Sequence, residues 1–161
     1  MNYKLASSTW DNKEIEAIQR VIQSDKYSMG EEVKEYEHKF AEYVGSKYAV
    51  MVSSGSAANL LMIASMFFTG EKSRRLQRGD EVIVPAVSWS TTYFPLQQYG
   101  LKVKFVDIDR ATLNINMEKL EAAITDKTRA ILAVNLLGNP NDFDKIEQLI
   151  SGRQITLLED N

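Results

Sequence analysis

Residues 53–59, Ser-Ser-Gly-Ser-Ala-Ala-Asn, are the stretch whose residue types could most directly bind a ligand. An apolar run that predicts a strand, residues 48–52, precedes them, and a run that predicts a helix, residues 57–68, comes after them. A helix that begins after such a turn has unpaired backbone N–H groups at its positive end. The stretch therefore predicts an anion site, most often for phosphate, while an ordinary turn with Ser as N-cap stays open.

Three further candidates follow or end other apolar runs. Trp89 follows the run 81–87, Asn135 lies near the end of the run 129–136, and Asp160 follows the run 154–159. Ligands of parallel sheets bind where the strands end, so these side chains are expected at one edge. An anion site, an aromatic side chain and an acid suit a flat, phosphorylated, cationic ring. The nucleotide motifs GxxxxGKS/T and GxGxxG do not occur in the sequence.

The order of apolar runs predicts the elements that position these residues. Continuous runs such as Val82-Ile83-Val84 are typical of parallel strands that are covered on both faces. The predicted strands are 48–52, 81–87, 102–107, 129–136 and 154–159, and the predicted helices are 57–68, 91–99, 117–124 and 143–150. The fold class is therefore α/β, with a mainly parallel sheet covered by helices.

Two helices are expected before this alternation begins. Asp11 and Glu14 form a capping-box pattern at the start of the first helix, and Gly45 is expected to end the second in a left-handed conformation. His38, the single histidine, lies off the apolar face of the second helix. We therefore expect a solvated side chain there rather than a catalytic one.

Composition excludes several classes of protein. The length of 161 residues suits one domain, and the net charge of -3 argues against broad nucleic-acid binding. Without cysteine there is no disulfide framework or thiol chemistry. No apolar run approaches the roughly 20 residues that span a bilayer, and the start lacks a signal peptide, so a cytoplasmic protein is expected. Asp107 and Asp109 could bind a metal, but the favoured interpretation is that they end a strand and cap the next segment.

Motifs in order along the whole chain resemble the DegT/StrS-type sugar aminotransferases, which are pyridoxal-phosphate (PLP) enzymes of the aspartate-aminotransferase fold (fold type I). The motifs are residues 27–30 (YSMG), 45–50 (GSKYAV), 53–59 (SSGSAAN), 79–85 (GDEVIVP), 135–140 (NLLGNP) and 158–161 (LEDN). The resemblance implies that residues 1–45 are an N-terminal helical segment and that 46–161 are the first part of the PLP-binding large domain. It also implies that the fold is truncated, with the C-terminal small domain absent.

The resemblance assigns a cofactor role to each candidate residue. Gly55 and Ser56 would hold the cofactor phosphate, Trp89 would stack on the pyridine face, and Asp160 would pair with the pyridine nitrogen. That ion pair keeps the ring protonated, so that it can accept electrons. Asn135 lies where the family often has a His near the cofactor and substrate.

Two details resemble a 3-dehydratase branch of this family. They are residues 85–93 (PAVSWSTTY) and the ending Glu159-Asp160-Asn161, where many aminotransferases have Glu-Asp-Ala. The branch implies removal of the C3 hydroxyl from a nucleotide-activated, GDP-linked 4-keto-6-deoxy sugar in deoxysugar and O-antigen biosynthesis. PLP or pyridoxamine phosphate (PMP) would be the cofactor and glutamate the amino donor, and family members are homodimers.

No catalytic residue is assigned within the chain. The residue that acts at the cofactor's C4′ is expected beyond Asn161, as His in the dehydratase branch and as Lys in the aminotransferases. Two alternatives stay open beside dehydration. One is a PLP-dependent sugar aminotransferase that uses glutamate, and the other is an inactive truncated remnant that binds PLP weakly or not at all.

Overall fold

The computed structural model describes residues 7–161, which form two compact units. The first unit ends at Val52 and is helical. The second unit comprises Ser53–Asn161 and contains every strand found among the described residues.

The first unit contains two helices, α1 (Asn12–Ser24) and α2 (Glu31–Val44). The capping box predicted at Asp11 is confirmed, since its carboxylate accepts from Lys13 N while the Glu14 carboxylate accepts from Asp11 N. Gly45 ends α2 with φ of 70°, as predicted. His38 is exposed, which agrees with the prediction of a solvated side chain.

The strand predicted at residues 48–52 is wrong. This segment has no strand structure, and the side chains of Tyr48 and Val50 are 74% and 67% exposed. A strand is stable only when its backbone pairs with a neighbour and one face is buried, and no segment of the chain's described part pairs with this run. Residues 53–56 therefore follow a loop rather than a strand end.

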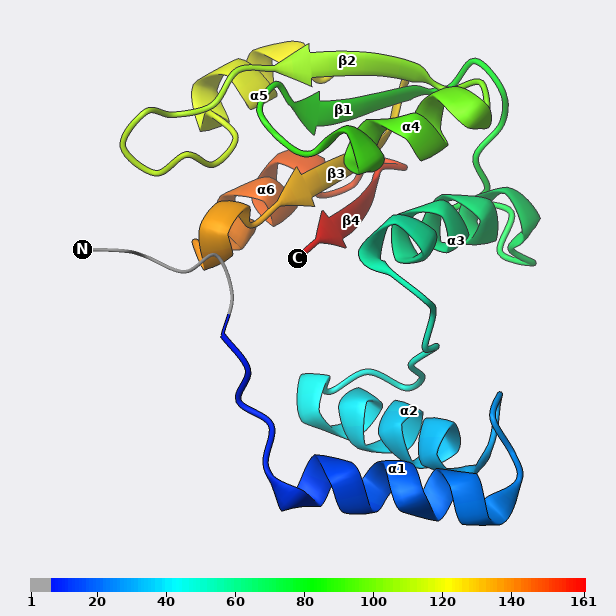
Figure 1. Ribbon diagram of the computed structural model, residues 1–161. Helices are drawn as coiled ribbons and strands as arrows, with labels where there is room; N and C mark the ends of the chain where they lie inside the picture. Colours follow the sequence, from blue (N-terminus) through cyan, green and yellow to red (C-terminus); the bar gives the residue numbers. More distant parts are fainter. Residues whose placement is uncertain (1–6) are drawn as a thin grey trace. The chain divides into compact units, whose positions relative to one another are not determined.

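The second unit is a parallel α/β fold, which confirms the predicted fold class (Figure 1). Its elements are α3 (Gly55–Phe68), β1 (Glu81–Pro85), α4 (Ser90–Gln98), β2 (Lys102–Val106), α5 (Met117–Ala123), β3 (Thr128–Val134), the 3-10 turn η1 (Leu136–Gly138), α6 (Phe143–Ile150) and β4 (Thr156–Asp160). The strands are ordered β2-β1-β3-β4, and all three pairings are parallel.

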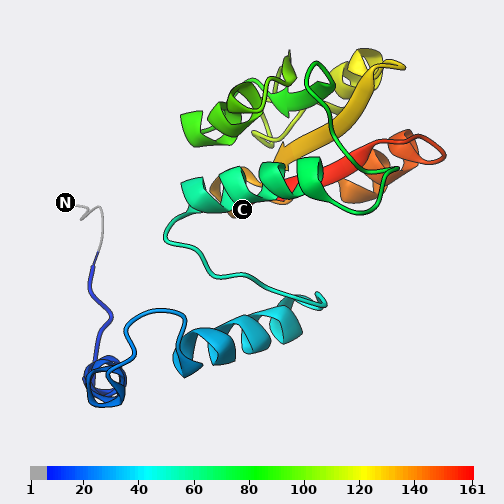
Figure 2. The same cartoon turned by 90° about the vertical axis from the view of Figure 1, so that its right-hand side faces the viewer.

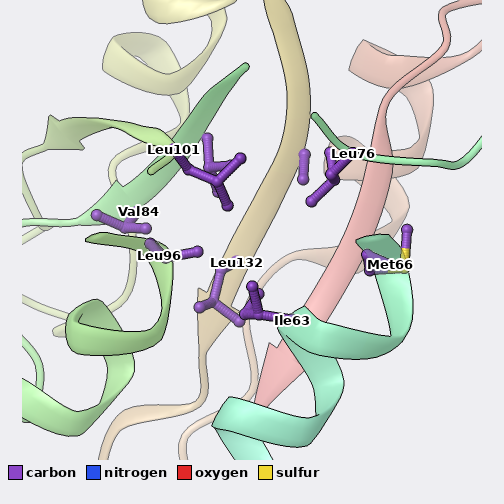
Figure 3. Close-up of a cluster of buried hydrophobic side chains, with 9 residues drawn as sticks. Ile63, Met66, Leu76, Val84, Leu96, Leu101 and Leu132 are labelled. Carbon is purple, nitrogen blue, oxygen red and sulfur yellow. The ribbon is translucent and has the colours of Figure 1, made fainter. Parts of the chain in front are cut away.

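Helices cover both faces of the sheet, with α3 and α4 on one side and α5 and α6 on the other (Figure 2). Successive strand residues point to opposite faces, so Val84 and Leu132 pack with Ile63 of α3 and Leu96 of α4 (Figure 3). The intervening side chain Ile131 packs in the other cluster, with residues of α5 and α6. Two buried clusters therefore hold the strand ends in fixed positions.

Helix α3 is apolar along most of its length, but it has only 14 residues. Across residues 7–161, no helix is both long enough and apolar enough to cross a membrane.

Candidate functional site

The carboxyl ends of β1, β3 and β4 lie along one edge of the sheet, because these strands are parallel and paired (Figure 1). Trp89 lies four residues after the end of β1, Asn135 directly follows β3, and Asp160 is the last residue of β4. A hydrogen bond from the Asn59 side chain to Asp160 brings the start of α3 to the same edge. The second unit alone therefore gathers the five candidate residues.

Gly55 and Ser56 are the first two residues of α3. The Ser54 hydroxyl caps the helix by accepting from Ala57 N at 3.2 Å. The amides of Gly55 and Ser56 have no partner one turn earlier within the helix, and both residues are exposed. The start of α3 thus has the two properties that bind phosphate, free N–H groups and the positive end of a helix dipole.

Asp160 is fixed through one of its two carboxylate oxygens. Asn59 Nδ2 donates to Oδ2 at 2.9 Å, and Thr92 Oγ1 donates to the same oxygen at 2.6 Å. Neither bond uses Oδ1. The carboxylate is half-buried, and Oδ1 remains able to accept a hydrogen from a ligand.

Trp89 lies in the N-cap position of α4, and its side chain is 76% exposed. The loop before it is tied down by Tyr93, whose hydroxyl donates to Pro85 O at 2.7 Å. Burial raises the pKa of the Tyr93 phenol, so the hydroxyl keeps the proton it donates. A large, exposed aromatic side chain on a fixed loop is suited to stack on a flat ring.

Most hydrogen-bonding positions of the Asn135 side chain are already paired with other residues of the chain. Its Oδ1 accepts from Asn141 N at 3.0 Å and from Asn141 Nδ2 at 2.9 Å, and its Nδ2 donates to the side chain of Asn161. Asn141 also donates to Val134 O at 2.8 Å. Asn135 therefore shapes the loop after β3 and keeps one amide hydrogen outside these bonds.

Sequence reasoning assigned no role to two residues that contact Asp160. Asn59 and Thr92 are 5% and 0% exposed, and they are 101 and 68 residues from Asp160 in the chain. The available signal was a single amide side chain inside the apolar run of α3 (Ala-Ala-Asn-Leu-Leu), because a buried polar group needs a partner.

Asp107 and Asp109 act as the favoured interpretation predicts. The Asp107 carboxylate accepts from Ile108 N and pairs with Lys119, and Asp109 accepts from the amides of Ala111 and Thr112. The bond from Lys119 lowers the pKa of Asp107, and the backbone bond from Thr112 lowers that of Asp109. Among the described residues, no group of three or more acidic or histidine side chains could hold a metal ion.

Known proteins resemble this chain in sequence and in fold. The chain is 70% identical over all of its 161 residues to the GDP-4-keto-6-deoxy-D-mannose 3-dehydratase of Yersinia pseudotuberculosis, and it covers 40% of that protein. A crystal structure of GDP-4-keto-6-deoxymannose-3-dehydratase with a trapped PLP-glutamate geminal diamine matches with a TM-score of 0.95 and 69% identity, over 99% of this chain and 41% of that chain.

A further crystal structure of that type of enzyme, a mutant with bound GDP-perosamine, matches with a TM-score of 0.95 and 68% identity. The match covers 99% of this chain and 41% of that one. The chain thus spans about two-fifths of the length of the relatives it matches.

The family model described as the DegT/DnrJ/EryC1/StrS aminotransferase family matches residues 8–161. That match includes all five candidate residues and both side chains that contact Asp160. The chain belongs to the DegT/DnrJ/EryC1/StrS aminotransferase family.

Proposed function

We propose that this chain holds PLP or PMP at the carboxyl edge of its sheet, in an enzyme that removes the C3 hydroxyl of a GDP-linked 4-keto-6-deoxy sugar. The observation that carries the proposal is Asp160, whose Oδ2 is held by Asn59 and Thr92 while Oδ1 lies outside both bonds. The substrate class rests on the relatives, one named as a GDP-sugar 3-dehydratase and one solved with GDP-perosamine.

The residues present fit this cofactor. A Cβ added to Gly55 would meet nothing within 4 Å, and its backbone lies outside the left-handed region that favours glycine, so the chain's own packing does not require glycine there. A close approach of a phosphate to the backbone would require it. Gly55 and Ser56 would hold the phosphate, and Trp89 would cover the ring face.

Asp160 would keep the pyridine nitrogen protonated by accepting its hydrogen at Oδ1. When bound, the protonated ring supplies a sink for the electron pair left by a departing proton. The helix start and the carboxylate thus hold opposite ends of the cofactor, and the fixed loop with Trp89 limits water access to one face.

The proposal extends to features that rest on the relatives and on family resemblance. We propose glutamate as the amino donor, since a relative was trapped with PLP and glutamate. A homodimer, a cytoplasmic location and the use of this activity in O-antigen biosynthesis stay predictions. So does the division into a helical segment, residues 1–45, and the first part of the large domain, residues 46–161.

Calorimetric titration of the purified protein with PMP tests the cofactor part. Saturable binding at one site supports it, whereas no binding overturns it and favours the inactive remnant. The sugar chemistry is tested by mass spectrometry after incubation with PMP, glutamate and GDP-4-keto-6-deoxymannose. A product without the C3 oxygen supports dehydration. A 4-amino sugar that keeps this oxygen would support the aminotransferase alternative. An unchanged sugar would mean that this chain alone completes neither reaction, as expected if the residue that acts at C4′ lies beyond Asn161.

A further inference from the structure

The side chains around Asp160 come from three elements of the second unit, and hydrogen bonds connect them. Asn59 comes from α3, Thr92 from α4 and Asp160 from β4. Ser88, in the loop before α4, lies 2.9 Å from Thr92 Oγ1. Since the single hydroxyl hydrogen of Thr92 goes to Asp160, Ser88 must donate to Thr92.

This arrangement places two donors on one carboxylate oxygen. Donors that point at an ionised acceptor form shorter and stronger bonds than neutral pairs, and the 2.6 Å distance from Thr92 to Oδ2 fits that class. Donation from Ser88 polarises the Thr92 hydroxyl and strengthens its bond further. Two such bonds on one oxygen oppose rotation of the Asp160 carboxylate.

Because the donors Asn59 and Thr92 are buried, we infer that their role is to bind this carboxylate. Asn59 and Thr92 are 5% and 0% exposed, beside apolar neighbours such as Ile63 and Leu96 that form the core. An apolar side chain of similar size would fill either position without the cost of burying a polar group. Asn59 has one other contact, a longer one of 3.5 Å to Thr91 O.

We propose that Asn59 and Thr92 are positioning residues, which hold the Asp160 carboxylate in one orientation through Oδ2, so that Oδ1 accepts the N–H of the cofactor's pyridine ring. This inference rests on the proposed cofactor site. Pyridine protonation at this site requires a carboxylate that does not turn away from the ring nitrogen. Loss of either donor lets the carboxylate turn, so the ring nitrogen loses proton occupancy.

The test is the 15N chemical shift of PMP labelled at the pyridine nitrogen and bound to the purified protein. Wild type is expected to give the shift of a protonated nitrogen at pH 8. Thr92→Val removes the hydroxyl at nearly constant volume and should move the shift towards that of a neutral nitrogen. Loss of one bond to a charged acceptor corresponds to about a tenfold change in the ratio of protonated to neutral nitrogen.

Thr92→Ser is the matched control, because it keeps the donor and should restore the wild-type shift. A side chain that only ties α4 to β4 would lower stability without moving the nitrogen shift. Wild-type shifts in both Thr92→Val and Asn59→Ala, with PMP bound, would overturn this inference and leave the proposed cofactor site intact. If Thr92→Val does not fold, Asn59→Ala decides by the same criterion. Failure of wild type to bind PMP overturns the proposed function, and this inference with it.

Discussion

Asp160 and Asn135 lie at the ends of two adjacent parallel strands, β4 and β3, yet their side chains are bonded in opposite ways. Asp160 accepts both of its side-chain bonds at Oδ2, and neither involves Oδ1. Asn135 accepts two bonds at Oδ1 and donates a third from Nδ2, all within the loop that follows β3 and the chain's last residue.

The difference indicates that the two side chains have different roles at the same edge of the sheet. The side chain of Asn135 is bonded mainly to its own loop, so its removal should cost stability. The side chain of Asp160 is held by buried donors with one strong acceptor directed elsewhere, so its removal should cost ligand affinity as well as stability. Substitutions along this edge can test whether the contrast holds.

The largest effect is expected from Asp160→Ala, which removes the partner of the pyridine nitrogen. Loss of a hydrogen bond between charged groups costs about 2 kcal/mol, so affinity for PMP should fall roughly 30-fold by calorimetry. Glu159→Gln is the matched control, since Glu159 is exposed on the same strand. Equal losses in the two variants would mean that only the local negative charge matters.

Asn135→Ala should act mainly on the fold. It leaves two donors of the buried Asn141 without their acceptor, so the free energy of unfolding in denaturant should fall by about 2 kcal/mol. Affinity for PMP should fall less than about threefold, because a single amide hydrogen remains for a ligand. A loss of affinity as large as that of Asp160→Ala would abolish the contrast and make Asn135 a principal cofactor contact.

Trp89→Ala should weaken PMP binding without changing stability. Aromatic stacking contributes about 1 kcal/mol, equivalent to about fivefold in affinity, and Trp89→Phe should recover most of it. The side chain is 76% exposed, so the free energy of unfolding should stay within about 0.5 kcal/mol. Trp10→Ala in the first unit is the control, and an equal effect there would point to a non-specific loss.

The smallest effect is expected from Gly55→Ala, which should stabilise the fold but weaken PMP binding. Alanine fits this position, so the free energy of unfolding should rise by about 0.5 kcal/mol, as measured by denaturant titration. Binding of PMP should nevertheless weaken, because the methyl group lies where a phosphate would approach. Improved binding would place the phosphate elsewhere.

Much of the fold could be predicted from local patterns. Apolar runs predicted the four paired strands, and the capping pattern at Asp11 predicted a helix start that the structure confirms. The run at 48–52 has the same apolar character but no pairing partner among the described residues. The pattern of a single sequence does not indicate which segments will pair as strands.

The same limit applies to the site. Gly55 and Asp160 carry local signals, a glycine at a helix start and an acid at a strand end. The bonds from Asn59 and Thr92 to Asp160 join residues that are 101 and 68 positions apart. The sequence around Asn59 and Thr92 does not indicate that Asp160 is their acceptor. Only the folded sheet, which brings α3, α4 and β4 together, makes these contacts visible.

A crystal structure of the protein with bound PMP tests the central claim most directly. The phosphate is expected within hydrogen-bonding distance of the Gly55 and Ser56 amides, and the pyridine nitrogen within hydrogen-bonding distance of Asp160 Oδ1. Oδ2 should keep its bonds to Asn59 and Thr92. A cofactor bound at another place, or a pyridine nitrogen that contacts no atom of Asp160, would contradict the account.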